Sequence, residues 1–156
     1  MITREQAEAF LYREARLADE HLYDDWEGLW TDDATYWVPA NADDIDPATQ
    51  ISIIFDNRAR ISTRIKQLHT GKRHAQAPPS RVRRLIGNVE ILGDEAGETL
   101  VGSNFMLVES RERGTQIWAG RTEHRLRLLD GELRMAYKKV MLVDNDRAVF
   151  TLAFLI

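Results

Sequence analysis

The 156-residue chain contains no cysteine. Disulfides, thiolate metal sites and thiol nucleophiles are therefore all excluded. The chain also lacks any apolar run that approaches the roughly 20 residues of a membrane-spanning helix. Its first segment, MITREQAEAF, carries acidic residues and no continuous apolar core, so it matches neither a signal peptide nor a transit peptide. We therefore expect a cytoplasmic protein that does not enter a membrane.

The chain also has no excess of positive charge. The 21 basic and 25 acidic side chains give a net charge of −4, which provides no general attraction to nucleic acid or to anionic lipid. Glycine-rich phosphate loops and nucleophile-elbow motifs are also absent from the sequence. The composition, 44% hydrophobic and 29% charged, is typical of soluble globular proteins. We expect no nucleic-acid partner and no covalent catalysis.

The sequence shows no internal repeat, low-complexity run or linker that would divide it. A chain of 156 residues fits one ordinary domain, which buries roughly 70% of the surface that its unfolded form exposes. We therefore predict a single domain over residues 1–156.

The first part of the chain has helical patterning. Thr3 and Gln6 form a capping box, and apolar residues then recur on one helical face, so the spacing predicts a helix over residues 4–22. Either Asp24 or Asp25 is expected to cap a short second helix.

A run of β-forming residues follows and predicts a strand over residues 35–38. A second short strand is expected over residues 51–55. Asp56 then stands where it can cap a third helix that continues to about Leu68.

From Ser80 onward the helical spacing gives way to four long strand patterns. The Asp130-Gly131 pair between the last two of them is the strongest hairpin signal, because a two-residue turn of this type needs positive φ. Helices followed by a long antiparallel meander predict an α+β fold in which a strongly curved, mostly antiparallel sheet wraps the N-terminal helices. The four strands are expected over residues 81–92, 99–111, 115–129 and 132–143.

Two histidines, His69 and His74, raise the question of a metal site. Lys72 and Arg73 lie between them and would repel a divalent cation, so we expect no metal ligand here. A Rieske cluster needs two thiolates and two imidazoles, which a chain without cysteine cannot supply. We predict no catalytic, cofactor-binding or metal-binding residue in this chain.

The alternative to a chain without catalytic residues is an enzyme that carries out acid–base chemistry in a cone-shaped pocket. Ketosteroid isomerase uses an aspartate base together with a tyrosine and a protonated aspartate. Here the corresponding candidates are Asp56, Tyr36 and His124. They would make the chain an autonomous isomerase, dehydratase or small-molecule binding protein of the cone fold.

The basic cluster Arg81, Arg83 and Arg84 opens the first long strand. Arginine is the charged residue that subunit interfaces favour, so the cluster predicts protein contact. The segment 148–156 is strongly apolar, and we expect it to be buried, docked as a strand. The further candidate interface residues are Trp118, Phe150 and Phe154.

Three motifs occur in order along the chain: TDDATYWVPA, ISIIFDNRARISTRIKQLHTG and PPSRVRRLIGNVEI. Together they resemble the small (beta) subunit of bacterial aromatic-ring-hydroxylating dioxygenases, the Rieske non-haem iron oxygenases. These subunits share the cone of the ketosteroid-isomerase and nuclear transport factor 2-like proteins, so the resemblance implies the same fold here.

The resemblance also implies a function. The chain would be a non-catalytic structural subunit in aromatic compound catabolism. Its partner would be a large (alpha) subunit that carries the iron-sulfur cluster and the mononuclear iron, in a three-plus-three hexamer with a trimer of small subunits. Electrons would come from NADH through a reductase.

Overall fold

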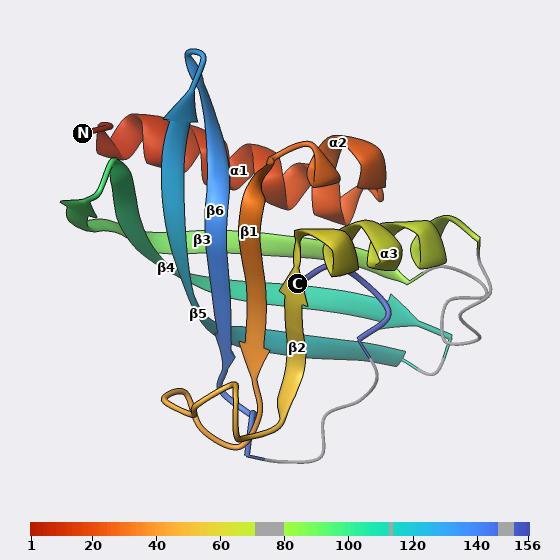
Figure 1. Ribbon diagram of the computed structural model, residues 1–156. Coiled ribbons are helices and arrows are strands. Elements are labelled where there is room, and N and C mark those ends of the chain that lie inside the picture. Colours follow the sequence, from red (N-terminus) through yellow and green to blue (C-terminus); the bar gives the residue numbers. More distant parts are fainter. Residues whose placement is uncertain (71–79, 113, 147–151) are drawn as a thin grey trace.

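The computed structural model describes residues 1–70, 80–112, 114–146 and 152–156 (Figure 1). Within these residues, helices precede most of a single six-stranded sheet, so the predicted α+β class is confirmed. The helices are α1 (Arg4–Asp19), α2 (Tyr23–Glu27) and α3 (Arg58–His69). The strands are β1 (Trp30–Pro39), β2 (Ser52–Asn57), β3 (Arg81–Glu95), β4 (Glu98–Arg111), β5 (Gly114–Leu129) and β6 (Glu132–Leu142).

The strand order in the sheet is β2-β1-β6-β5-β4-β3. Every neighbouring pair is antiparallel except β1 and β6, which run parallel. In Figure 1, β1, β2 and β6 stand upright, β3 and β4 run across, and β5 turns from one direction into the other. Register shifts at Gly87/Glu90 and at Arg125/Leu126 accompany this curvature, because a bulge bends its strand.

The N-terminal capping box is confirmed. The Gln6 N–H donates to Thr3 Oγ1 at 3.1 Å, and the Thr3 N–H donates to Gln6 Oε1 at 2.9 Å. The helix ends at Asp19 rather than at residue 22. His21 has a φ of 57°, a left-handed conformation that stops a helix.

Two capping predictions were wrong. Asp24 and Asp25 lie inside α2, whose N-cap residue Leu22 makes no side-chain cap. Asp56 belongs to β2, which extends further than predicted, and Asn57 caps α3 by accepting from the Arg60 N–H at 2.9 Å. The strand runs into the helix without an intervening loop, so the cap falls one residue later.

The hairpin between β5 and β6 is confirmed. Asp130 and Gly131 have φ values of 50° and 81°, and the flanking residues Leu129 and Glu132 pair across the turn. Two successive residues with positive φ are what a type I′ turn requires.

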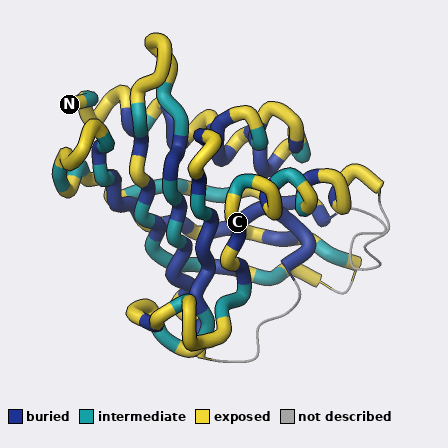
Figure 2. Tube along the Cα trace, viewed as in Figure 1, coloured by how far each residue is buried: buried dark blue, intermediate teal, exposed yellow. Residues whose placement is uncertain are grey.

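The core lies where the curved sheet meets the helices, and Figure 2 shows buried residues along the middle of the strands. The segment 152–156 is buried in this core, as predicted. Residues 152–156 are not a strand, so for them that part of the prediction was wrong, and residues 148–151 lie outside the described residues. Phe154 packs edge-on against Trp118 with ring centroids 5.5 Å apart.

Gly120 in β5 lies opposite Leu142 in β6. A Cβ atom added there would overlap the backbone carbonyl oxygen of Met141. Gly120→Ala is therefore expected to lower the free energy of unfolding by about 1–3 kcal/mol, as overpacking does, measured by urea denaturation. Gly93→Ala is the control, because a Cβ there meets no atom within 4 Å. An unchanged Gly120→Ala midpoint would contradict this packing.

Candidate functional site

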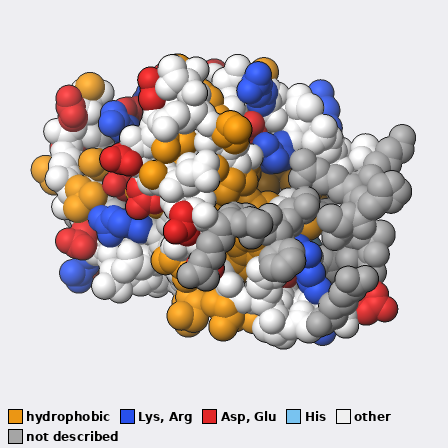
Figure 3. All heavy atoms as spheres, turned by 90° about the horizontal axis from the view of Figure 1, so that it is seen from below, with side chains coloured by type: hydrophobic (Ala, Val, Ile, Leu, Met, Phe, Trp, Pro, Cys, Tyr) orange, Lys and Arg blue, Asp and Glu red, His pale blue; other side chains and the backbone are white. Residues whose placement is uncertain are grey.

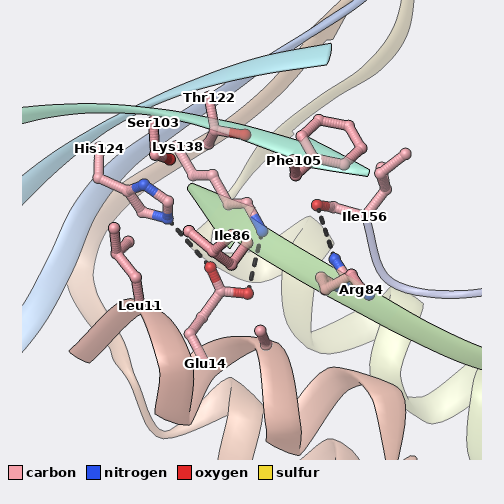
Figure 4. A pocket seen from close by; sticks show the side chains of 11 residues that line it. Leu11, Glu14, Arg84, Ile86, Ser103, Phe105, Thr122, His124, Lys138 and Ile156 are labelled. Carbon is pink, nitrogen blue, oxygen red and sulfur yellow. Dashed lines mark hydrogen bonds and ion pairs between the residues drawn. The ribbon is translucent and has the colours of Figure 1, made fainter. Parts of the chain in front are cut away.

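A small pocket lies between α1, the sheet and the segment 152–156 (Figure 4). Its volume of about 10 Å³ is close to the smallest volume that can hold one water molecule. Polar and charged side chains gather on one part of its wall. The lining residues are Leu11, Glu14, Ala15, Arg84, Ile86, Ser103, Phe105, Thr122, His124, Lys138 and Ile156.

Glu14 is the centre of this polar wall, although its side chain is buried. Its Oε2 accepts hydrogen bonds from Trp26 Nε1 at 2.9 Å and from Lys138 Nζ at 3.0 Å. Its Oε1 lies 3.0 Å from His124 Nε2 (Figure 4). Three donors thus replace the water that the carboxylate loses on burial.

The charges in this cluster follow from these contacts. Burial would raise the pKa of Glu14, but the Lys138 ammonium and the His124 bond reverse this and hold the pKa well below its ordinary value. Burial lowers the pKa of His124 and that of Lys138, although Glu14 opposes both shifts. At neutral pH the cluster is a Glu14–Lys138 ion pair beside a neutral imidazole.

The proton of the neutral imidazole belongs on Nε2, because the Glu14 carboxylate can only accept. Nδ1 of His124 is then an acceptor, and it is buried without a hydrogen-bond partner. His124 therefore donates one hydrogen bond, to Glu14, and its other ring nitrogen carries no proton.

Arg84 forms a second buried cluster at the edge of the pocket. Its Nε donates to Asp19 Oδ1 at 2.8 Å, and its backbone N–H donates to Asp19 Oδ2 at 3.0 Å. The two terminal nitrogens donate to the carbonyl oxygens of Leu155 at 2.6 Å and Ile156 at 3.3 Å. Its side chain is 3% exposed, so this arginine fastens the segment 152–156 to β3 and α1.

The candidate interface residues separate into two groups. Arg81 and Arg83 are exposed and remain available for contact with a partner. The side chains of Arg84, Trp118 and Phe154 are buried and make their contacts inside the chain. Arg84 lies on the inward face of β3, and Trp118 packs on Phe154 and donates to Glu109 Oε1 at 3.1 Å. Phe150 lies outside the described residues.

The structure brings two of the three predicted pocket groups together, because Tyr36 and Asp56 lie opposite each other across β1 and β2. Asp56 Oδ2 accepts from Arg64 Nε at 2.7 Å, and Tyr36 is fully buried with its oxygen accepting from the Ile156 N–H at 3.2 Å. Burial raises the pKa of Tyr36 far above its ordinary value. Of the three residues, His124 lines the pocket. Asp56 and Tyr36 thus each have a hydrogen-bond partner within the chain.

Sequence reasoning missed Glu14 and Lys138. The sequence contains a signal for each, a charged residue at a position that the pattern predicts to be buried. Glu14 follows Ala7 and Leu11 at helical spacing, on the face that should be apolar. Lys138 stands between Ala136 and Val140 on the inward face of β6. A charged residue at a core position implies a buried partner of opposite sign.

The donor set of the described residues does not fit an iron site. No group of three or more histidine, aspartate or glutamate side chains converges in residues 1–70, 80–112, 114–146 and 152–156. His69 Nε2 is paired with Asp24 Oδ1 at 2.8 Å, and His74 lies outside the described residues. The thiolates of a Rieske cluster are missing from the sequence itself.

In the described part of the chain, no helix has both the length and the apolar character that crossing a membrane would require.

The pocket cluster makes stability depend on pH. Between the lowered pKa of folded His124 and its ordinary value of 6.5, the unfolded chain binds more protons, so the free energy of unfolding rises with pH. The Tm is expected to fall as the pH drops from about 7 to about 5.5. His124→Gln, which keeps a donor near Glu14, should flatten this slope. His69→Gln, at an exposed ion pair, is the control, and equal slopes in all three proteins would contradict the assignment.

A curved sheet closed over N-terminal helices defines the class of cone-shaped α+β proteins. A solved chain named for scytalone dehydratase, from Novosphingobium aromaticivorans, has this fold, with a TM-score of 0.68, 14% identity and coverage of 94% of this chain and 89% of that one. The chain belongs to the ring hydroxylating beta subunit family, whose family model matches residues 13–147. The predicted cone and the predicted family are both confirmed.

Proteins that are similar to this chain are named as small or beta subunits of dioxygenases. The small oxygenase component of the p-cumate 2,3-dioxygenase system of Pseudomonas putida is 35% identical over 148 residues, 90% of this chain and 79% of that protein. The toluate 1,2-dioxygenase beta subunit of the same species is 30% identical, over 93% and 92% of the two chains. The crystal structure of the benzoate 1,2-dioxygenase beta subunit of Burkholderia mallei has a TM-score of 0.79 at 26% identity, covering 91% of each chain.

Proposed function

We propose that this chain is the non-catalytic structural subunit of a dioxygenase that dihydroxylates an aromatic ring. The family match over residues 13–147 carries this proposal. Its relatives are named as small or beta subunits of dioxygenases that act on p-cumate, toluate and benzoate. The large subunit would hold the iron-sulfur cluster and the mononuclear iron, and NADH would supply electrons through a reductase in the cytoplasm.

The proposed assembly has three large and three small subunits. The chain shares its fold with a chain of naphthalene 1,2-dioxygenase, with a TM-score of 0.78 at 17% identity. A three-plus-three complex would place a trimer of this chain against the large subunits and leave oxygen chemistry to them.

The interior of the cone supports a structural role. Its pocket of about 10 Å³ is too small for an aromatic ring, and the segment 152–156 lies against it. The charged groups at the pocket are bonded within the chain: Glu14 to Lys138, and Arg84 to Asp19 and the Leu155 carbonyl oxygen. This pocket therefore cannot hold an aromatic substrate, which supports a chain that is inactive on its own.

Co-expression with the large subunit tests this function. The chain should co-purify with it in equal amounts, in a coloured complex that contains iron, with the mass of three copies of each subunit. Purified alone, the chain should be colourless, free of iron and inactive with any reductase. Iron bound by the isolated chain, or no complex with the large subunit, would overturn the proposal.

A His124 variant of the assembled complex tests whether this chain has a structural or a catalytic role. His124→Gln removes the imidazole from the pocket, and we expect the assembled complex to keep its kcat within about twofold, because no proton passes through this residue in the reaction. Glu8→Gln on the outer side of α1 is the control. A complex of normal mass whose kcat falls about a hundredfold, as on loss of a general acid or base, would show that the chain has a catalytic residue.

A further inference from the structure

The outer face of the sheet carries an exposed apolar surface on β3, β4 and β5. Along these strands buried and exposed residues alternate, with Val82, Leu107 and Trp118 pointing inward. Hydrophobic residues also stand on the outward side. Leu85 is 76% exposed and Ile117 is 60% exposed. The sheet patch consists of Leu85, Met106, Val108 and Ile117.

The register of the sheet makes this patch continuous. Leu85 is opposite Met106 across β3 and β4, and Val108 is opposite Ile117 across β4 and β5. Directly opposed residues in a sheet have Cβ atoms about 5 Å apart. Four neighbouring large apolar side chains in water are unusual for a monomer and mark a surface that another protein covers.

The sheet patch has a basic border. Arg83 is opposite Val108, and Arg81 lies two residues earlier on the same side of β3. Both are exposed, and the nearest acid to Arg83 is Glu20 at 3.9 Å. In the face shown in Figure 3, hydrophobic side chains gather near the middle, with both basic and acidic side chains around them. A partner of this surface must be apolar at its centre and acidic at its edge.

A second surface of the same chain has this chemistry. The segment 43–51 joins β1 to β2, and it exposes the acids Asp43, Asp44 and Asp46. Ile51 at its end is 78% exposed. Asp43 accepts from Asn145 Nδ2 at 2.6 Å, so this segment is held beside the end of β6. The acidic segment, residues 43–51, therefore offers three exposed carboxylates followed in sequence by one exposed apolar side chain.

We propose that the sheet patch of one copy binds the acidic segment of a second copy. The contact joins two different surfaces, so it repeats head to tail and closes as a ring when the rotation between copies allows it. Arginine–carboxylate pairs border an apolar centre in such an interface. This inference rests on the proposed subunit role and names the surfaces through which the small subunits meet.

Light scattering after size-exclusion chromatography tests the contact with the full chain purified alone. The native chain should elute as a ring of identical copies. Ile117→Asp and Leu85→Asp should each shift it to monomer while the far-UV circular dichroism remains native. Leu128→Asp is the matched control, because Leu128 lies on the same strand β5, is 57% exposed and is outside the sheet patch; it should stay assembled.

Charge exchange identifies the two surfaces as partners. Arg83→Glu and Asp44→Arg should each weaken assembly at least tenfold in Kd, and the double variant should restore most of it. A native chain that is monomeric alone would overturn the inference, and so would Ile117→Asp that still assembles. If Ile117→Asp instead keeps its oligomer and loses the large subunit, the patch binds that subunit, and the inference is wrong while the proposed function stands.

Discussion

Glu14→Gln is expected to lower the free energy of unfolding by about 3–5 kcal/mol, the usual cost of breaking a buried ion pair by removing one partner. Glutamine keeps the size of the side chain and removes its charge. The Lys138 ammonium, which lies 3.0 Å from the carboxylate, is left in the core without a counterion. Trp26 Nε1 and His124 Nε2 bond to different carboxylate oxygens, so the amide nitrogen of glutamine replaces the acceptor of one of them.

Thermal unfolding measures this effect. For a protein of this size, each kcal/mol corresponds to roughly 2–4 °C, so the Tm should fall by about 6–20 °C. Glu8→Gln is the matched control on the same helix, because its ion pair with Arg4 is exposed to solvent and contributes at most about 1 kcal/mol. A Glu14→Gln protein as stable as Glu8→Gln would show that the buried cluster does not hold the fold.

The double variant Glu14→Gln, Lys138→Met should recover part of this loss. It removes the stranded ammonium together with the carboxylate, and uncharged side chains of similar volume often replace buried ion pairs at little cost. Stability below that of Glu14→Gln alone would mean that Lys138 contributes by packing rather than as a buried charge.

Arg84→Met is the second substitution with a large expected effect. It leaves the buried Asp19 carboxylate with the backbone N–H of residue 84 but without a cation, and it removes the bonds to the carbonyl oxygens of Leu155 and Ile156. We expect a loss of about 3–5 kcal/mol in the free energy of unfolding. Arg84→Lys should recover little of it, because one ammonium cannot reach a carboxylate and two carbonyls in the planar fork that arginine provides.

Hydrogen exchange followed by mass spectrometry locates the damage. In Arg84→Met the amides of residues 152–156 should exchange faster than those of β4 and β5, because the segment detaches before the sheet opens. Arg125→Met on the exposed side of β5 is the control, and the loss of its contact with the Tyr137 ring costs at most about 1 kcal/mol. Uniform exchange throughout the chain would contradict the anchoring role of Arg84.

The fold was readable from the sequence where local signals agree with tertiary packing. The capping box at Thr3 and the hairpin at Asp130-Gly131 are local devices, and both formed as expected. The three motifs also identified the family. The boundaries that failed, at residue 22 and at Asp56, depend on a left-handed residue and on a strand that continues into a helix, and neither has a local sequence signature.

The site was predictable only in part. His124 was expected to be a pocket or core residue and does line the pocket, yet its partner Glu14 is 110 positions away in sequence. Pairing of this kind is set by how the sheet curves over α1, which periodicity does not reveal. Strand alternation predicts that Arg84 faces the opposite way from Arg81 and Arg83, and its side chain does lie on the inward face of β3, but nothing in the sequence indicates that Asp19 and the segment 152–156 are its partners.

The parallel pairing of β1 with β6 has a consequence for biosynthesis. Thr35 in β1 lies opposite Tyr137 in β6, so about 100 residues must leave the ribosome before the two halves of the sheet can join. Until then β1 presents an open hydrogen-bonding edge, the kind of edge that invites pairing with the wrong chain. We therefore expect the nascent protein to depend on chaperones late in translation and to fold slowly, in step with its long-range contacts.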